Sequence, residues 1–132
     1  VYLSISISII CIAKLIVFFC QDLDLIYYVL KRLSNNVTDA NLKQLRKLEH
    51  VDLDNCAAVS DEGITALARN CPNMKSLIVQ QCRSVTDEGI TSNVSICENL
   101  NNLNVTYSGV TANCVTDLKK NYWYSAMLLF LC

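Results

Sequence analysis

The chain has 132 residues, the length of a single domain, and its formal net charge is −1 with an isoelectric point near 5.7. The sequence contains no basic cluster, so binding to nucleic acid is not expected. Three glycines, one proline and the lack of low-complexity tracts argue against a long disordered linker.

Residues 1–36 form an apolar N-terminal segment. Residues 1–20 carry one charge, Lys14, and are just long enough to span a bilayer. A central lysine in a spanning helix costs about 2.5–3.5 kcal/mol. The chain starts at Val1 rather than methionine, so we expect a fragment. Three interpretations stay open: a cap or buried remnant of an upstream repeat, a membrane anchor, or a gene-model artefact. We favour the cap or the artefact over the anchor.

A 26-residue step organises the middle of the chain. Seven pairs of like residues keep this step: Cys56/Cys82, Val59/Val85, Asp61/Asp87, Glu62/Glu88, Gly63/Gly89, Ile64/Ile90 and Cys71/Cys97. Three apolar series keep it as well: Leu48/Met74/Leu100, Val51/Leu77/Leu103 and Leu53/Val79/Val105. A fixed period of this length is typical of stacked solenoid repeats, which bind partners along an extended face.

Each unit of the repeat is predicted to contain a strand and a helix. Val51 and Leu53 alternate with polar neighbours, as in a strand with one buried face. Ser60 or Asp61 is expected to cap the helix that follows, and Pro72 to end it. The spacing predicts one buried helical stripe, made of Ile64, Leu67, Ala68 and Cys71.

The unit Leu48-x-x-Val51-x-Leu53-x-x-Cys56 matches the leucine-rich-repeat template. The stretch NCAAVSDEGITALARNCPNMKSLIVQQCRSVTDEGI resembles the cysteine-containing subclass of these repeats, which is common in F-box/leucine-rich-repeat proteins and in the antagonist-of-mitotic-exit-network family. The resemblance covers residues 37–118. It implies an α/β solenoid of about three short strand–helix repeats, with parallel strands on the concave face. Residues 119–132 are then an apolar C-terminal tail.

The units at the two ends depart from the pattern. The first unit is four residues shorter between Asp39 and its strand, and it lacks the cysteine at the end of its helix. The third unit has Ser108 in place of the first repeat cysteine and Cys114 at the glycine position. Asn93 stands where Leu67 stands one repeat earlier. We interpret these departures as the edges of an array near the minimum of about three repeats.

Eight cysteines would suggest disulfides in a secreted chain, but their placement favours free thiols. Four occupy apolar positions of the repeat, where a free thiol behaves as a small buried hydrophobe. Their spacings of 15, 11 and 15 residues are too wide for a C-x-x-C metal site. We therefore expect a cytoplasmic or nuclear protein without cofactor or metal, with a membrane-anchored form as the alternative. The four expected structural cysteines are Cys56, Cys71, Cys82 and Cys97.

Catalytic chemistry is not expected. His50 is the single histidine, and it could form an acid/base site with Asp52 and Asp54 on the same face. We favour a polar row that contacts solvent or a partner. The repeated Ser-Asp-Glu-Gly and Thr-Asp-Glu-Gly stretches are interpreted as helix starts, and no phosphate loop, nucleophile elbow or zinc signature occurs in the sequence. We interpret the protein as non-enzymatic.

The candidate partner-binding residues follow from stacking the predicted strands. The first row is His50, Ser76 and Asn102. The second row is Asp52, Ile78 and Asn104. The third row is Asp54, Gln80 and Thr106, with Asn55, Gln81 and Tyr107 at the rim. Ile78 and Tyr107 are the apolar side chains that could anchor an interface.

Protein–protein recognition is the function that this pattern favours. By resemblance, the chain would be the substrate-recruiting part of an F-box-type receptor in an SCF ubiquitin ligase, which serves ubiquitin-dependent protein catabolism. The segment QDLDLIYYVLKRLS lacks the Leu-Pro opening of an F-box, so the scaffold contact would need an F-box upstream. Two alternatives stay open: a free-standing adaptor of the mitotic-exit-antagonist type, and a membrane-anchored structural subunit.

Overall fold

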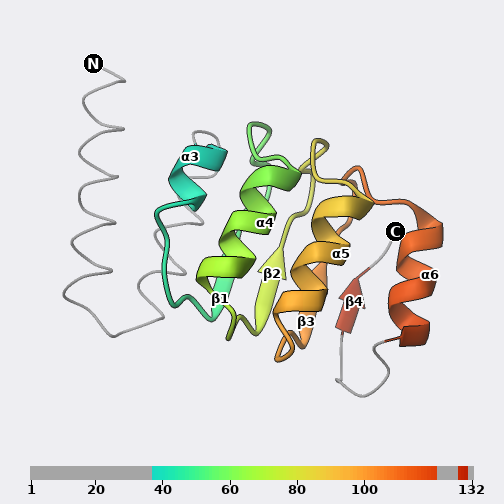
Figure 1. Ribbon diagram of the computed structural model, residues 1–132. Coiled ribbons are helices and arrows are strands. Elements are labelled where there is room, and N and C mark those ends of the chain that lie inside the picture. The colour runs from blue at the N-terminus through green and yellow to red at the C-terminus, as the bar shows by residue number, and fades with distance from the viewer. Residues whose placement is uncertain (1–36, 122–127, 131–132) are drawn as a thin grey trace.

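The computed structural model describes residues 37–121 and 128–130 (Figure 1). The N-terminal segment 1–36 lies outside the described residues, so its three interpretations stay predictions. No helix within the described ranges is long and apolar enough to cross a membrane. The elements alternate along the chain: α3 (Asp39–Leu42), β1 (His50–Asp52), α4 (Asp61–Asn70), β2 (Ser76–Ile78), α5 (Asp87–Ile96), β3 (Asn102–Asn104), α6 (Ala112–Asn121) and β4 (Leu128–Phe130).

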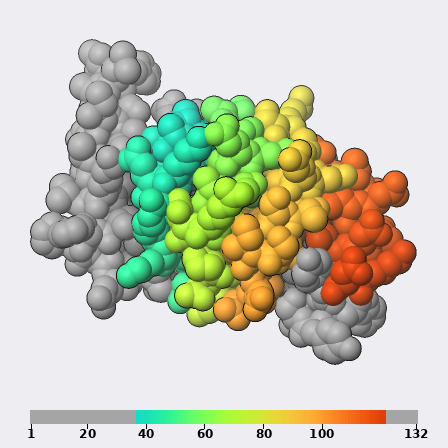
Figure 2. All heavy atoms as spheres, viewed as in Figure 1, coloured from blue at the N-terminus to red at the C-terminus, as the bar shows by residue number. Residues whose placement is uncertain are grey.

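The strands form one four-stranded parallel sheet in the order β1-β2-β3-β4. Leu77 pairs with Val51 on one side and with Leu103 on the other, so the register follows the 26-residue step. Figure 1 shows the helices side by side in one layer against the sheet, and Figure 2 shows consecutive units as adjoining bands of colour. The predicted α/β solenoid with parallel strands is confirmed.

The backbone pairing continues beyond the short strands. The N–H of Asn55 donates to the carbonyl of Gln80 at 2.8 Å, and the N–H of Gln81 donates to the carbonyl of Thr106 at 2.9 Å. The third predicted row is therefore held in the same register as the first two.

The expected C-terminal tail contributes to the sheet. The helix α6 extends past residue 118 to Asn121, and β4 lies within residues 119–132. Leu129 pairs with Leu103, which is again a step of 26 residues. The tail thus adds a fourth strand to the three that the repeat pattern predicted.

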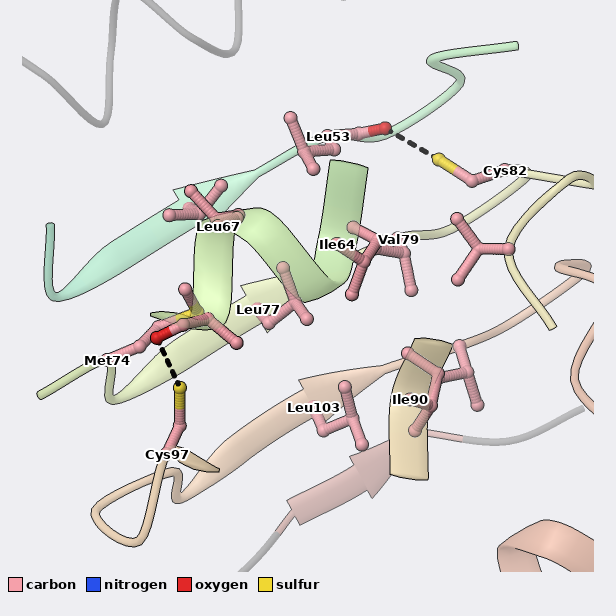
Figure 3. Close-up of a cluster of buried hydrophobic side chains, with 14 of the residues drawn as sticks. Leu53, Ile64, Leu67, Met74, Leu77, Val79, Cys82, Ile90, Cys97 and Leu103 are labelled. Atoms are coloured by element: carbon pink, nitrogen blue, oxygen red, sulfur yellow. Dashed lines mark hydrogen bonds between the residues drawn. The ribbon is translucent and has the colours of Figure 1, made fainter. Parts of the chain in front are cut away.

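The core lies between the helices and the sheet (Figure 3). Leu77 is fully buried between its strand neighbours Val51 and Leu103, which are also fully buried. Burying one such side chain stabilises the fold by about 1.5–3 kcal/mol. The predicted helical stripe is confirmed, because all four of its members have no exposed surface: Ile64, Leu67, Ala68 and Cys71.

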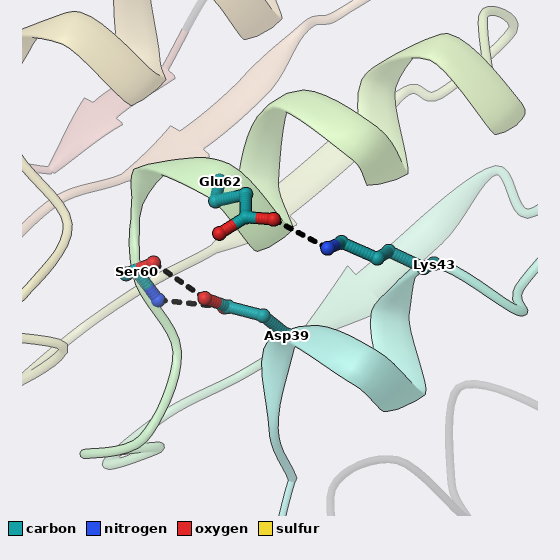
Figure 4. A network of polar contacts seen from close by, with 4 residues as sticks. All are labelled: Asp39, Lys43, Ser60 and Glu62. Carbon is teal, nitrogen blue, oxygen red and sulfur yellow. Dashed lines mark hydrogen bonds and ion pairs between the residues drawn. The ribbon is translucent and has the colours of Figure 1, made fainter.

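The helices begin as predicted, but the hydroxyl at the start of α4 does not cap its own helix. Ser60 precedes Asp61, and its side chain makes no capping hydrogen bond. Its backbone N–H and its hydroxyl instead donate to the carboxylate of Asp39 in the preceding repeat, at 2.8 and 2.5 Å (Figure 4). The carboxylate is a charged acceptor, and hydrogen bonds to a charged acceptor are stronger than those between neutral groups.

This contact recurs, and we call it the inter-repeat clamp: an aspartate carboxylate that accepts the N–H and the hydroxyl at the start of the next helix. Thr86 donates both groups to Asp61, at 2.7 and 2.5 Å. Thr111 donates both groups to Asp87, at 2.7 and 2.6 Å. The clamp therefore links the four helices of residues 37–121 in chain order.

A glycine makes room for the clamp. A Cβ atom on Gly63 would lie 2.2 Å from Oδ1 of Asp39, and a Cβ atom on Gly89 would lie 2.3 Å from Oδ1 of Asp61. Non-bonded atoms do not come this close, so any side chain at either glycine would displace the carboxylate. The repeated Asp-Glu-Gly stretch is thus explained by packing between repeats as well as by the start of a helix.

The first repeat completes its helix start differently. Asn41 stands at the glycine position of α3, and its Oδ1 accepts hydrogen bonds from the N–H and the hydroxyl of Thr38, at 2.9 and 3.0 Å. The Asn41 amide oxygen is thus the acceptor here, whereas in the later repeats the acceptor is the aspartate of the preceding repeat. The shorter first unit therefore satisfies its own N-terminal donors.

Asn93 is the polar departure in the core. It has no exposed surface, and neither its Oδ1 nor its Nδ2 has a hydrogen-bond partner within the described residues. It occupies the place on α5 that Leu67 occupies on α4. A buried amide without partners destabilises the fold by about 1–3 kcal/mol.

Candidate functional site

The candidate site is the side of the sheet that faces away from the helices, which we call the polar sheet face. Its side chains alternate along each strand with the buried residues of the core. Pairing brings the predicted rows together, since His50 pairs with Ser76 and Ser76 with Asn102. The face consists of His50, Asp52, Asp54, Ser76, Ile78, Gln80, Asn102, Asn104, Thr106 and Tyr107.

Exposure varies across this face. Asp52 and Ser76 are buried, with 3% and 6% of their surface exposed. The other residues in the three rows are partly buried. Tyr107 is 66% exposed and is the one exposed large hydrophobic residue among residues 37–121. Asp52 and Ser76 therefore support their neighbours, whereas Ile78 and Tyr107 offer surface to a partner.

Side-chain amides tie the strands together. Asn102 Nδ2 donates to Ser76 Oγ at 3.1 Å, and Asn104 Nδ2 donates to Gln80 Oε1 at 3.1 Å. Asn104 Oδ1 also accepts from the N–H of Thr106 at 3.0 Å. These bonds fix the orientation of both amides before any partner arrives.

The same local bond recurs in the first repeat of the face. Asp52 Oδ1 accepts a hydrogen bond from the N–H of Asp54 at 3.0 Å, as Asn104 does for Thr106 two strands away. Two acceptor atoms of the polar sheet face have no hydrogen-bond partner among the described residues: Asp54 Oδ1 and Asn102 Oδ1, both buried. Because neither atom is exposed, each lowers the stability of the fold and neither is open to a partner.

The rim has an unusual backbone conformation. Asn55, Gln81 and Tyr107 have φ values of 60°, 60° and 56°, in the left-handed region. Asparagine tolerates this region, whereas other non-glycine residues pay about 1–2 kcal/mol. All three side chains are exposed. Tyr107 is therefore a bulky aromatic residue held at a strained and exposed position.

The charges near the face are distributed unevenly. Glu49, just before β1, accepts from Lys75 Nζ at 2.6 Å, and this hydrogen bond lowers the pKa of the Glu49 carboxyl. Asp54 has no ion-pair partner within the described residues. Across residues 37–121 and 128–130, no group of three His, Cys, Asp or Glu side chains is placed to hold a metal ion.

All four expected structural cysteines are buried and free. The Cys82 thiol donates to the carbonyl of Leu53 in the preceding repeat at 2.9 Å (Figure 3). The Cys97 thiol lies 3.5 Å from the carbonyl of Cys71. Burial raises the pKa of the Cys56 thiol to about 12. Such thiols stay protonated near neutral pH and react slowly.

Some structural residues were not predicted from the sequence. Cys114 is a fifth buried free cysteine, with its sulfur 4.0 Å from the Thr91 hydroxyl. The clamp aspartates were assigned only to helix starts. The sequence did contain a signal for the clamp, since Asp-Glu-Gly occurs in two successive repeats. In each case the aspartate is the acceptor for the next repeat.

Comparison with known proteins identifies the repeat type. A family model described as Leucine Rich repeat matches residues 44–68 and 70–92. The first match contains β1 and most of α4, and the second contains β2 and the first part of α5. No curated protein matches the chain. The matched segments are thus two successive units of the solenoid, and such repeats typically serve as non-enzymatic binding modules.

Proposed function

We propose that this leucine-rich-repeat solenoid recognises a protein target on its polar sheet face and recruits that target to an SCF-type ubiquitin ligase. One observation carries the recognition step: side chains tied across the strands lie beside the exposed ring of Tyr107. Solenoids present such extended faces to partners. We accordingly propose a binding role without enzymatic activity.

The fixed side chains favour binding for an entropic reason. Asn104 is bonded through its nitrogen to Gln80 and through its oxygen to the backbone of Thr106. Groups that are held before association lose little conformational freedom when a partner binds. Ile78 and Tyr107 add apolar surface beside these polar groups. Apolar anchors in polar surroundings are typical of protein interfaces.

The ligase role rests on the resemblance of the cysteine-containing repeats to those of F-box proteins. In that family an F-box domain docks on the ligase scaffold while the repeats hold the target. The segment QDLDLIYYVLKRLS lies outside the described residues, and the scaffold contact is proposed to come from an F-box elsewhere in the gene product. We propose a cytoplasmic or nuclear location, because reducing compartments preserve buried free thiols.

Affinity capture of the complete gene product from cell extract tests the ligase role. Co-purification of ligase scaffold subunits together with a target supports recruitment, and the target should lose its ubiquitin when the gene is deleted. A target captured without scaffold subunits would favour the free-standing adaptor. Recovery of the product only from the membrane fraction would favour the anchored subunit and contradict the proposal.

A further inference from the structure

The charge of the polar sheet face is concentrated in its first repeat. The carboxylates of Asp52 and Asp54 lie there. The side chains that the next two repeats place in the three rows are uncharged: Ser76, Ile78, Gln80, Asn102, Asn104 and Thr106. A partner that covers this face meets negative charge at one side and neutral surface at the other.

Asp54 is the carboxylate that a partner can reach. It is partly exposed, unlike Asp52, and it has no ion-pair partner in the part of the chain that the structure describes. Glu49, in contrast, is already paired with Lys75. A positively charged side chain from a partner would complement the charge of Asp54.

Tyr107 marks the other side of the face. Its ring is 66% exposed, and its backbone has a φ of 56° at a position where the first repeat has Asn55. Gln81 has the same conformation, so the turn belongs to each repeat and holds Tyr107 at the rim. Tyrosine is also among the residues that carry most of the binding energy in interfaces. An apolar side chain of the partner would pack on this ring.

The distance between the two anchors sets the spacing in the partner. Asp54, Gln80 and Thr106 form one row just beyond the ends of β1, β2 and β3, where the backbone pairing continues, and paired backbones are about 4.8 Å apart. The row from Asp54 to Thr106, next to Tyr107, therefore spans about 10 Å, which an extended peptide covers in about three residues. We infer that this face takes an extended protein segment that crosses the strands and brings a Lys or Arg side chain to Asp54 and an apolar side chain, about three residues away, to Tyr107.

This inference rests on the proposed function, and a peptide selection tests both. The full chain is used as bait for a random 12-residue peptide library, and enriched peptides are synthesised and titrated by fluorescence anisotropy. We expect peptides with a Lys or Arg about three residues from an aromatic or aliphatic residue. Asp54→Asn should weaken binding at least tenfold. Selection on Asp54→Lys should instead enrich acidic peptides.

Tyr107→Asn separates binding from folding. Asparagine accepts the left-handed backbone, so this variant should melt at or above the temperature of the parent and still bind at least tenfold more weakly. Arg69→Glu on the exposed side of α4 is the matched control and should bind like the parent.

The outcomes distinguish the two claims. One outcome would overturn this inference and still support recognition by the polar sheet face. In that outcome the enriched peptides bind more weakly to Ile78→Arg, but they are not enriched in Lys or Arg and bind Asp54→Asn as tightly as the parent. If the parent and the Ile78→Arg baits enrich the same peptides, or neither enriches any, both the inference and the proposed recognition face are wrong.

Discussion

The carboxylate of Asp61 joins two repeats, because it accepts hydrogen bonds from both the backbone N–H and the hydroxyl of Thr86, at 2.7 and 2.5 Å. Asp61 lies in the first turn of α4, and Thr86 immediately precedes α5. A Cβ atom on Gly89 would lie 2.3 Å from the same carboxylate. The three residues therefore act as one unit at this junction, as Asp39, Ser60 and Gly63 do at the junction before it. At the next junction Cys114 stands at the glycine position.

Gly89→Ala should destabilise the protein although it lies in a helix. Replacing a helical glycine with alanine normally stabilises by about 1 kcal/mol. Here the added methyl group displaces the Asp61 carboxylate, whose bonds to Thr86 are worth about 2 kcal/mol or more. Chemical denaturation measures the change. Adding Asp61→Ala should cost less in the Gly89→Ala background than in the parent, and purely additive costs would contradict the clamp.

Asn93→Leu should stabilise the protein. The substitution removes a buried amide without partners and restores the leucine found at this position one repeat earlier, so we expect a gain of about 1–3 kcal/mol. The exposed Asn113 provides a control, since Asn113→Leu should change stability by less than about 0.5 kcal/mol. An unchanged or lower melting temperature for Asn93→Leu would show that the amide is satisfied.

Leu77→Asp should abolish the folded state. An unpaired charge in the centre of the core costs several kcal/mol, which is comparable to the stability of a small domain. Ile78→Asp is the matched control one position further along, on the partly exposed face, and should stay folded. Circular dichroism melting compares the two. Similar melting curves would mean that the assignment of strand faces is wrong.

The buried thiols predict a dependence of stability on alkaline pH. Burial raises the thiol pKa of Cys56 to about 12 and those of Cys82 and Cys97 to about 11, from 9.0. The folded state therefore holds these protons more tightly than the unfolded state. This stabilisation is complete below pH 9 and is lost as the pH rises towards 12.

Thiol modification provides the accompanying readout. At pH 8, a bulky maleimide should leave the four repeat cysteines unmodified until denaturant is added, as followed by mass spectrometry of tryptic peptides. The four are Cys56, Cys71, Cys82 and Cys97. Rapid labelling of all four in the folded protein would contradict their burial.

The sequence predicts the strand register well, because one step of 26 residues fixes the pairing of Val51, Leu77 and Leu103. Leu129 keeps the same step and could have extended the pattern into the tail. The direction of the Ser60 hydroxyl could not be predicted from local sequence, because its acceptor belongs to another repeat.

The candidate site was predicted less completely than the fold. Alternation along the strands assigns Asp52 and Ser76 to the polar face. It does not predict that the two side chains are buried there by their neighbours. The left-handed backbone of Tyr107 has no local signal, since Asn55 is the only residue type in that series that favours it. The 26-residue step places Asn55, Gln81 and Tyr107 at the same point of the repeat, and all three are left-handed, so Asn55 was the available signal for the other two.

The central claim is that recognition uses the polar sheet face, and one binding comparison tests it most directly. The affinity of the full chain for one captured target or enriched peptide is measured for Ile78→Arg and for the helix variant Arg69→Glu, after both variants are shown to melt like the parent. We predict that Ile78→Arg weakens binding at least tenfold and that the helix variant binds normally. Loss of binding in the helix variant, with Ile78→Arg unaffected, would place the recognition surface on the helices and contradict the account.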